Sequence, residues 1–272
     1  MPETIVEVAP FASYGASHWS VLALLGLGCV ALVAVGRRLR GTPALARFNR
    51  AFALVVVGVM VPMNTYLWLP SQWDLKISLP FDLCDLAWGA AAYTLWTGRT
   101  TLAYGAVYYW GLTLTTQGLF TPDLREDFPH IYFIMFFASH CLTPAAAIYL
   151  TWGVGMRPTW KLMWGTVVLT MIWGACMLLF NTLAGTNYLY VNAKPQAASL
   201  LDLFGPWPAY LAVALGVATT IWALLTWPWY WFAKRAWQAP RDDAPRPLAT
   251  PRGRAPWSAP DAPTIERTTT RA

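Results

Sequence analysis

The stretch Gly185-Thr-Asn-Tyr-Leu-Tyr-Val-Asn-Ala-Lys-Pro195 indicates the architecture because it connects two long apolar runs, residues 160–183 and 203–232. About 20 apolar residues are enough for a helix to cross the hydrocarbon core of a bilayer. A polar, aromatic connector, followed here by Gly205-Pro-Trp-Pro-Ala-Tyr210, is typical of a loop at a membrane surface. This part of the chain is therefore predicted to cross a membrane twice.

Similar apolar runs of spanning length fill the chain before this connector. They lie near residues 17–36, 51–70, 80–97, 101–120 and 129–152. The run at 17–36 follows Glu3 and Glu7 and has no basic start, so we expect a true span and not a signal peptide. Together the runs predict an all-α polytopic membrane protein, a bundle of seven transmembrane helices.

Composition supports this fold class and excludes a soluble domain. Hydrophobic residues make up 57% of the chain and charged residues 12%, whereas a soluble domain averages about 25% charged residues. This small number of charges cannot cover a water-exposed surface. Membrane lipids are therefore the expected partners. The net charge of +6 comes mainly from loops and the tail, so it does not indicate a nucleic-acid partner.

Three parts of unequal size are predicted along the chain. Residues 1–16 form an outer N-terminal segment, and residues 17–237 form the seven-span domain. Residues 238–272 are rich in Pro and Arg and lack apolar periodicity, so we expect a disordered tail.

The positions of Lys and Arg predict the orientation, since cytoplasmic loops are rich in basic residues. One set of alternate connections carries many arginines, and the tail begins with Lys234 and Arg235. The other set is poorer in basic residues and holds Asp74, Asp123 and Asp202. The N-terminus is therefore predicted outside and the C-terminus in the cytoplasm, in the cell (inner) membrane. The arginines of the first set are Arg37, Arg38, Arg40, Arg47, Arg50, Arg99 and Arg157.

Cysteine spacing gives no sign of a metal site. The four cysteines fall in different predicted helices and form no CxxC pattern or Cys/His pattern of metal-binding spacing. The sequence has no Gly-rich loop of the kind that holds phosphates. We therefore expect neither a metal nor another cofactor.

A candidate reactive group lies in Leu79-Pro-Phe-Asp-Leu-Cys-Asp-Leu86. Asp82 and Asp85 are three residues apart and so share a helix face, with Cys84 beside it. Ionisable residues inside a span are rare and are functional candidates. For Asp82 a second interpretation is equally good. It is then a solvated residue at the start of a helix, where the helix dipole favours a negative charge.

Polar residues in later segments complete the candidate pocket. His140 lies in the middle of a span, and a Cys beside a His base is a plausible nucleophile. A histidine packed and hydrogen-bonded in the bundle is the alternative. Asn181 and Asn187 flank Gly185, and with Tyr188 they are expected to shape the same outward-facing pocket as Asp82, Cys84 and Asp85.

These motifs resemble those of the YwaF-type family of integral membrane proteins, which has animal transmembrane acyltransferases as relatives. The resemblance covers about residues 15–232 and rests on Leu79–Cys84, His140 with Pro144, Gly185–Pro195 and Gly205–Tyr210. It implies acyl transfer between phospholipids, with Cys84 as the nucleophile and His140 as the base. The family motif commonly has His where this chain has Asp82.

Other classes of function also fit parts of the sequence. Few charges and many aromatic residues are compatible with a non-catalytic accessory subunit of a larger membrane complex, such as a pigment or respiratory complex. A transporter is a weaker alternative, because no span contains a paired charge relay or an obvious broken helix. We predict a phospholipid acyltransferase and retain the accessory subunit as its alternative.

Overall fold

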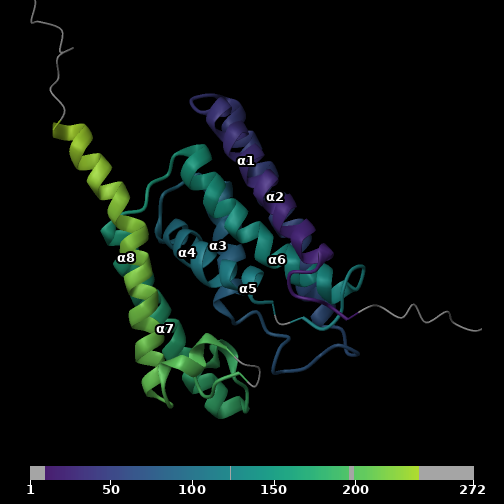
Figure 1. Cartoon of the computed structure of the whole chain (residues 1–272). Coiled ribbons are helices and arrows are strands. Elements are labelled where there is room, and N and C mark those ends of the chain that lie inside the picture. Colours follow the sequence, from purple (N-terminus) through teal and green to yellow (C-terminus); the bar gives the residue numbers. More distant parts are fainter. Residues whose placement is uncertain (1–9, 123, 196–198, 239–272) are drawn as a thin grey trace, which may run out of the picture.

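A computed structural model describes residues 10–122, 124–195 and 199–238, with side chains as far as Trp231. Within these ranges the chain is helical and has no β-strand. In Figure 1, α1 and α2 lie on one side, α7 and α8 lie on the other, and α3 to α6 lie between them. The predicted tail beyond Gln238, like residues 1–9, lies outside the described residues.

Each of the seven predicted segments corresponds to a helical segment. Five of them are long and apolar enough to cross a membrane: α1 (Ala16–Leu39), α2 (Pro43–Leu67), α6 with the π-helical η2 (Ile131–Val154), α7 (Trp160–Ala184) and α8 (Ala209–Gln238). The all-helical fold is therefore confirmed, with five spans identified by length and composition.

The two remaining segments form the centre of the bundle. α3 (Leu83–Thr97) has 15 residues. The next segment runs through α4 (Leu102–Trp110), the π-helix η1 (Gly111–Thr115) and α5 (Thr116–Phe120). Residues 104–110 of α4 are all buried. Other helices surround α4, so its tyrosines need not be compatible with lipid, whereas Gln117 of α5 is exposed.

Three helices begin at other residues than predicted. α2 begins at Pro43 and not near 51, because Pro is well suited to the first helical position. Arg47 and Arg50 therefore lie in a helix and not in a loop. α3 begins after Asp82, which is its N-cap. α8 begins at Ala209 because a separate short helix, η4 (Leu200–Phe204), precedes it.

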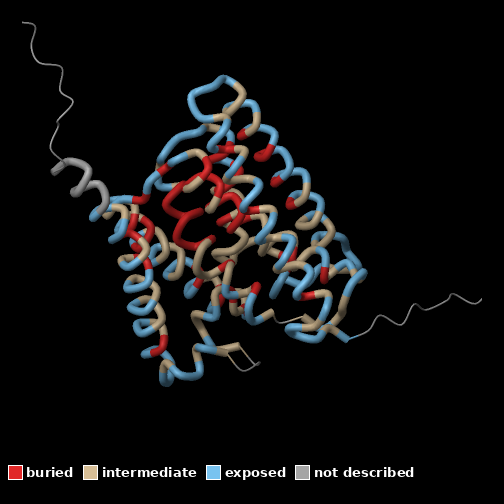
Figure 2. Tube along the Cα trace, turned by 45° about the horizontal axis from the view of Figure 1, so that its top comes forward, coloured by how far each residue is buried: buried red, intermediate tan, exposed pale blue. Residues whose placement is uncertain are grey.

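The outer helices present apolar side chains to their surroundings. Leu27 of α1, Leu54 of α2 and Leu183 of α7 are 70%, 60% and 79% exposed. Figure 2 shows that buried positions concentrate in the central helices, whereas the outer helices are largely exposed or intermediate. An apolar surface of this extent requires lipid contact. The chain is therefore a multi-pass membrane protein.

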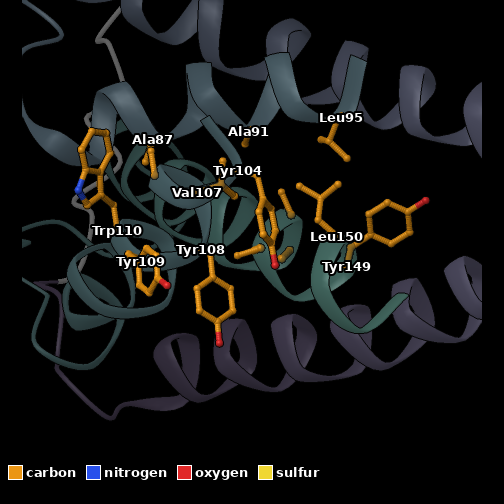
Figure 3. Packing of buried hydrophobic residues seen from close by; sticks show 14 of the residues in the cluster. Ala87, Ala91, Leu95, Tyr104, Val107, Tyr108, Tyr109, Trp110, Tyr149 and Leu150 are labelled. Carbon is orange, nitrogen blue, oxygen red and sulfur yellow. The ribbon is translucent and has the colours of Figure 1, made fainter. Parts of the chain in front are cut away.

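The core is built from small residues of α3 against large residues of α4 and η2. Figure 3 shows Ala87 and Ala91 beside the aromatic side chains of α4. The Tyr109 hydroxyl contacts Thr226 Oγ1 at 2.7 Å, and the Trp110 indole donates to Thr170 Oγ1 at 2.9 Å. These bonds satisfy polar groups that would otherwise be unpaired in a low-dielectric interior.

Candidate functional site

The predicted carboxylates lie at the start of α3. The Asp85 carboxylate accepts a hydrogen bond from the Asp82 backbone N–H at 3.2 Å. Asp82 Oδ1 accepts from the Leu189 backbone N–H at 2.9 Å. Asp82 is therefore joined to a residue more than 100 positions later in the chain, in the short helix η3 (Tyr188–Tyr190).

Cys84 is half-buried on the first turn of α3. Its thiol faces the Thr115 hydroxyl of η1 and lies within electrostatic range of Asp85 and Asp82. The Thr115 hydroxyl is fully buried and has no hydrogen-bond partner of standard geometry within the described residues. A donor next to a thiol is suited to stabilise a thiolate or an oxyanion.

The His140 side chain is fixed by its own helix. Nδ1 lies 2.8 Å from the Phe136 carbonyl oxygen and 3.0 Å from Ser139 Oγ. The imidazole stacks on the Phe136 ring with a centroid separation of 4.2 Å. The carbonyl can only accept, so Nδ1 carries the proton in a neutral ring. Nε2 is then the basic nitrogen.

The ring edge that carries Nε2 lies against Gly118 of α5. A Cβ atom at this position would collide with His140 Cδ2 and Nε2. Thr115 and Gly118 are three residues apart and lie on one face of the segment. Cys84 and His140 therefore both lie against this face, although no hydrogen bond joins them within the described part of the chain.

A cavity of about 700 Å³ lies between α2, α3 and α6. Its walls are partly apolar, with Met60, Met63, Leu67 and Met135. The polar lining includes Asp85, Ser139 and His140, and the loop before α6 adds Leu124, Arg125 and Glu126. A cavity with both apolar and charged lining residues suits an amphiphilic ligand. Cys84 does not line this cavity.

The predicted pocket residues Asn181, Asn187 and Tyr188 lie elsewhere. Asn181 is buried, and its amide donates to the Tyr188 carbonyl and to Asn192 Oδ1, both at 2.9 Å. Its Oδ1 accepts from Thr186 Oγ1 and from the Tyr188 N–H. Asn187 donates to the Ala193 carbonyl. These amides fold residues 185–195, which follow α7, and do not line the cavity.

We call residues 185–195 the connector, and it is bound to the segment before α3. The Tyr188 hydroxyl donates to the Leu75 carbonyl at 2.7 Å and accepts from the Leu79 N–H at 3.1 Å. The Phe81 ring packs edge-on against Tyr188, and its carbonyl accepts from the Trp173 indole. The two quoted sequence motifs therefore form one packed unit.

The third motif, Gly205–Tyr210, closes the connector from the other side. The Trp207 indole donates to the Val191 carbonyl at 3.0 Å. The Tyr210 hydroxyl donates to the Tyr190 carbonyl, and the Lys194 ammonium lies over the Tyr210 ring at 5.6 Å. The aromatic residues of this motif therefore hold the backbone of the connector.

Several cavity residues could not be identified from the sequence. In the sequence, Arg125 and Glu126 look like ordinary charged loop residues. They reach the cavity because the Phe11 backbone N–H donates to the Arg125 carbonyl and positions the loop. Thr115 gives no sequence signal, because threonines are common in this segment. Ser139 is the exception, since it directly precedes His140.

Comparison with known proteins gives one family. The model of the TMEM164 family matches residues 13–226. An uncharacterized protein of Treponema pallidum (strain Nichols) is 26% identical over 194 residues, which cover 70% of this chain and 79% of that protein. No solved structure matches the chain. The matched residues include every helix from α1 to η4 and most of α8.

Proposed function

The chain belongs to the TMEM164 family, and on that premise we propose that it transfers acyl chains between phospholipids. The observation that carries this proposal is the contact of His140 Nδ1 with the Phe136 carbonyl oxygen at 2.8 Å. Its Nδ1–H is directed to the Phe136 carbonyl, which leaves Nε2 as a base in a residue that lines an amphiphilic cavity. We also propose that, within this family, the chain is of the YwaF type and is related to the animal transmembrane acyltransferases.

The ligand class follows from the lining of the cavity. Met60, Met63 and Leu67 offer apolar contact to acyl chains, whereas Arg125 and Glu126 offer both charges to a polar head group. A phospholipid has both parts in one molecule. Asp85 lines the same cavity as His140 and acts as a pocket residue, whereas Asp82 positions the start of α3 through Leu189.

In the proposed reaction His140 Nε2 takes the proton of the Cys84 thiol, and the sulfur attacks the ester carbonyl carbon of a phospholipid. The C–O bond breaks, and the departing lysophospholipid oxygen receives the proton from His140. A second lysophospholipid hydroxyl then gives its proton to His140 and attacks the thioester. The C–S bond breaks, and the departing thiolate receives the proton from His140, which restores the thiol and the neutral imidazole. Thr115 beside Cys84 is suited to stabilise the charge that develops there.

We propose the number and orientation of the membrane spans together with this function. α3 and the α4–α5 segment cross together with the five long helices, which makes seven spans with the N-terminus outside. The N-terminal segment, the seven-span domain and the cytoplasmic tail keep the predicted limits of residues 1–16, 17–237 and 238–272. The cavity then faces the outer leaflet of the cell membrane.

The alternative is a non-catalytic accessory subunit of a larger membrane complex. One observation favours it, which is that Cys84 does not line the cavity that His140 lines. In that case the cavity binds a lipid as a structural ligand. The acyl-transfer proposal requires Cys84 and His140 to approach each other when a phospholipid binds.

An activity assay separates the two proposals. Purified protein is placed in phosphatidylcholine vesicles whose acyl chains carry a label, and a lysophospholipid is added as acceptor. We expect new labelled phospholipid, and His140→Gln should lower its rate of formation at least about a hundredfold. His130→Gln is the matched control, because His130 caps α6 outside the cavity. Folded protein that transfers no label, or an unaffected His140→Gln variant, would favour the accessory subunit.

A further inference from the structure

A second cavity lies along the C-terminal half of α1, from Cys29 to Arg37. α1 begins beside α5 and the loop of residues 124–126 that lines the first cavity. The His18 ring contacts the Leu119 carbonyl of α5, and the backbone N–H of Phe11, which precedes α1, donates to the Arg125 carbonyl. It ends beside η2 (Tyr149–Val154), where Arg40 donates to the Gly153 carbonyl. With 24 residues α1 separates these ends by about 36 Å. The second cavity is therefore not part of the candidate acyl-transfer site.

This second cavity is a groove of about 380 Å³ between α1 and the α6–η2 segment. We call it the α1 groove. Arg37 lies at its end in the last turn of α1. The rest of its lining is apolar or aromatic and consists of Cys29, Val30, Val33, Ala34, Ile148 and Trp152.

Close helix packing fixes the shape of the α1 groove. A Cβ atom at Gly36 would lie 2.8 Å from the Gly153 backbone and 2.9 Å from the Tyr149 ring. The two helices therefore touch beside the groove, with glycine on both sides of the contact. Ala34 has only a methyl group and is exposed, so the space above it stays open to the surroundings of the helix.

The charge around the α1 groove is of one sign. Residues 37–50 contain five arginines, and the sequence has no Asp or Glu between residues 8 and 73. The ion pair found in the described ranges joins Lys194 of the connector to Asp202 of η4. These arginines therefore have no carboxylate partner in their own part of the sequence.

Arg37 is held in place at the groove without being neutralised. Its Nε donates to the Trp152 carbonyl at 3.2 Å, and Arg40 Nη2 donates to the same carbonyl at 2.8 Å. Neutral carbonyl oxygens orient a guanidinium group but do not cancel its charge. The terminal nitrogens of Arg37 remain available for a phosphate, which a guanidinium binds in bidentate geometry. Arg38 beside it is exposed.

We propose that the α1 groove binds one anionic phospholipid. Its phosphate lies against Arg37 and Arg38, and one acyl chain lies along Val30, Val33 and Ala34. An anionic head group retains a net negative charge opposite arginines, whereas a zwitterionic head group has none. The site is specific because the guanidinium and the apolar groove are held together by the contact of α1 with η2.

Native mass spectrometry of the purified full-length protein in an uncharged detergent tests this proposal. Phosphatidylglycerol and phosphatidylcholine with identical acyl chains are titrated separately. We expect phosphatidylglycerol to bind at least about tenfold more tightly. Arg37→Gln should weaken it about fivefold, whereas Arg50→Gln should leave it unchanged, because Arg50 stacks on Trp96 outside the groove. Equal affinities for both lipids, or equal losses in both variants, would overturn the proposal.

A second pair of variants removes the groove and keeps every charge. Ala34→Phe fills the groove and should lower phosphatidylglycerol binding at least about tenfold. Ala31→Phe is the matched control, because Ala31 is an exposed residue of α1 that does not line the groove. Unchanged binding to Ala34→Phe would overturn the proposal even if Arg37→Gln fails to fold. Unchanged binding to Ala34→Phe would mean that the arginines attract the lipid only through their general charge at the membrane surface.

Discussion

At the residue scale, Asp82 has a structural role that its place in the sequence does not reveal. Leu189 has a φ of 60°, a left-handed conformation that is uncommon for a residue with a Cβ atom. Its backbone N–H donates to Asp82 Oδ1. The carboxylate therefore supports a strained turn of the connector while it caps α3.

This role predicts different effects for two substitutions of Asp82. Asp82→Asn keeps an Oδ1 acceptor and should change the free energy of unfolding little. Asp82→Ala leaves the Leu189 N–H without its acceptor and should lower it by about 1–3 kcal/mol. Thermal unfolding of the purified protein in detergent measures both. Equal melting temperatures for the two variants would contradict the role of the Asp82 to Leu189 bond.

Thr115 gives a second prediction at the residue scale. Thr115→Val should slow the reaction of Cys84 with a membrane-permeable maleimide about tenfold, because a donor that stabilises the thiolate is lost. Cys29, Cys141 and Cys176 are replaced by alanine so that only Cys84 reacts. Thr116→Val is the control, since its hydroxyl donates to the Gly111 carbonyl. A rate for Thr115→Val equal to that of the control would argue against a polar contact at Cys84.

At the scale of the elements, the presence of the seven apolar helical segments follows from the sequence, but their roles and several of their starts do not. Long apolar runs predict helices wherever they occur, and all seven are present. The runs at α3 and α4 differ from the others because neighbouring helices bury them, and burial depends on packing that no local pattern encodes. Helix starts were wrong where caps override hydrophobicity, as at Pro43 and Asp82.

Sequence reasoning also identified only part of the candidate site, because it detects residues that are close along the chain and not contacts made by packing. Asp82, Cys84 and Asp85 were expected together because they share one helix turn. Asn181, Asn187 and Tyr188 were expected in the pocket but instead fold the connector. Their bonds join residues five to eleven positions apart, and Tyr188 also bonds to the segment before α3. A polar residue at a helix end looks the same in sequence whether it binds a ligand or its own loop.

The contact of α1 with η2 predicts a strong position dependence for glycine substitutions. Gly36→Val should lower the free energy of unfolding by about 1–3 kcal/mol or more, because the added atoms overlap the Gly153 backbone. Gly28→Val on the same helix should have little effect, since a Cβ there meets no atom within 4 Å. Thermal unfolding measures both variants. Similar melting temperatures would show that α1 does not pack closely against η2.

At the scale of the whole molecule, the seven-span arrangement predicts that the two ends of the α4–α5 segment lie on opposite sides of the membrane. Arg99 and Thr121 are exposed residues just outside these ends. In a variant without natural cysteines, Thr121→Cys should react with a membrane-impermeant maleimide in intact cells, and Arg99→Cys should react only after lysis. Labelling of both before lysis, or of neither, would exclude a crossing by this segment.

The central claim is that Cys84 carries the acyl group during transfer. Purified protein is incubated with phospholipid that bears a labelled acyl chain, and label on the protein is tested for release by hydroxylamine. We predict hydroxylamine-sensitive label in the wild type and in Cys176→Ala, and its loss in Cys84→Ala and His140→Gln. Label that persists in Cys84→Ala, or folded wild-type protein that acquires none, would contradict the acyl-cysteine mechanism.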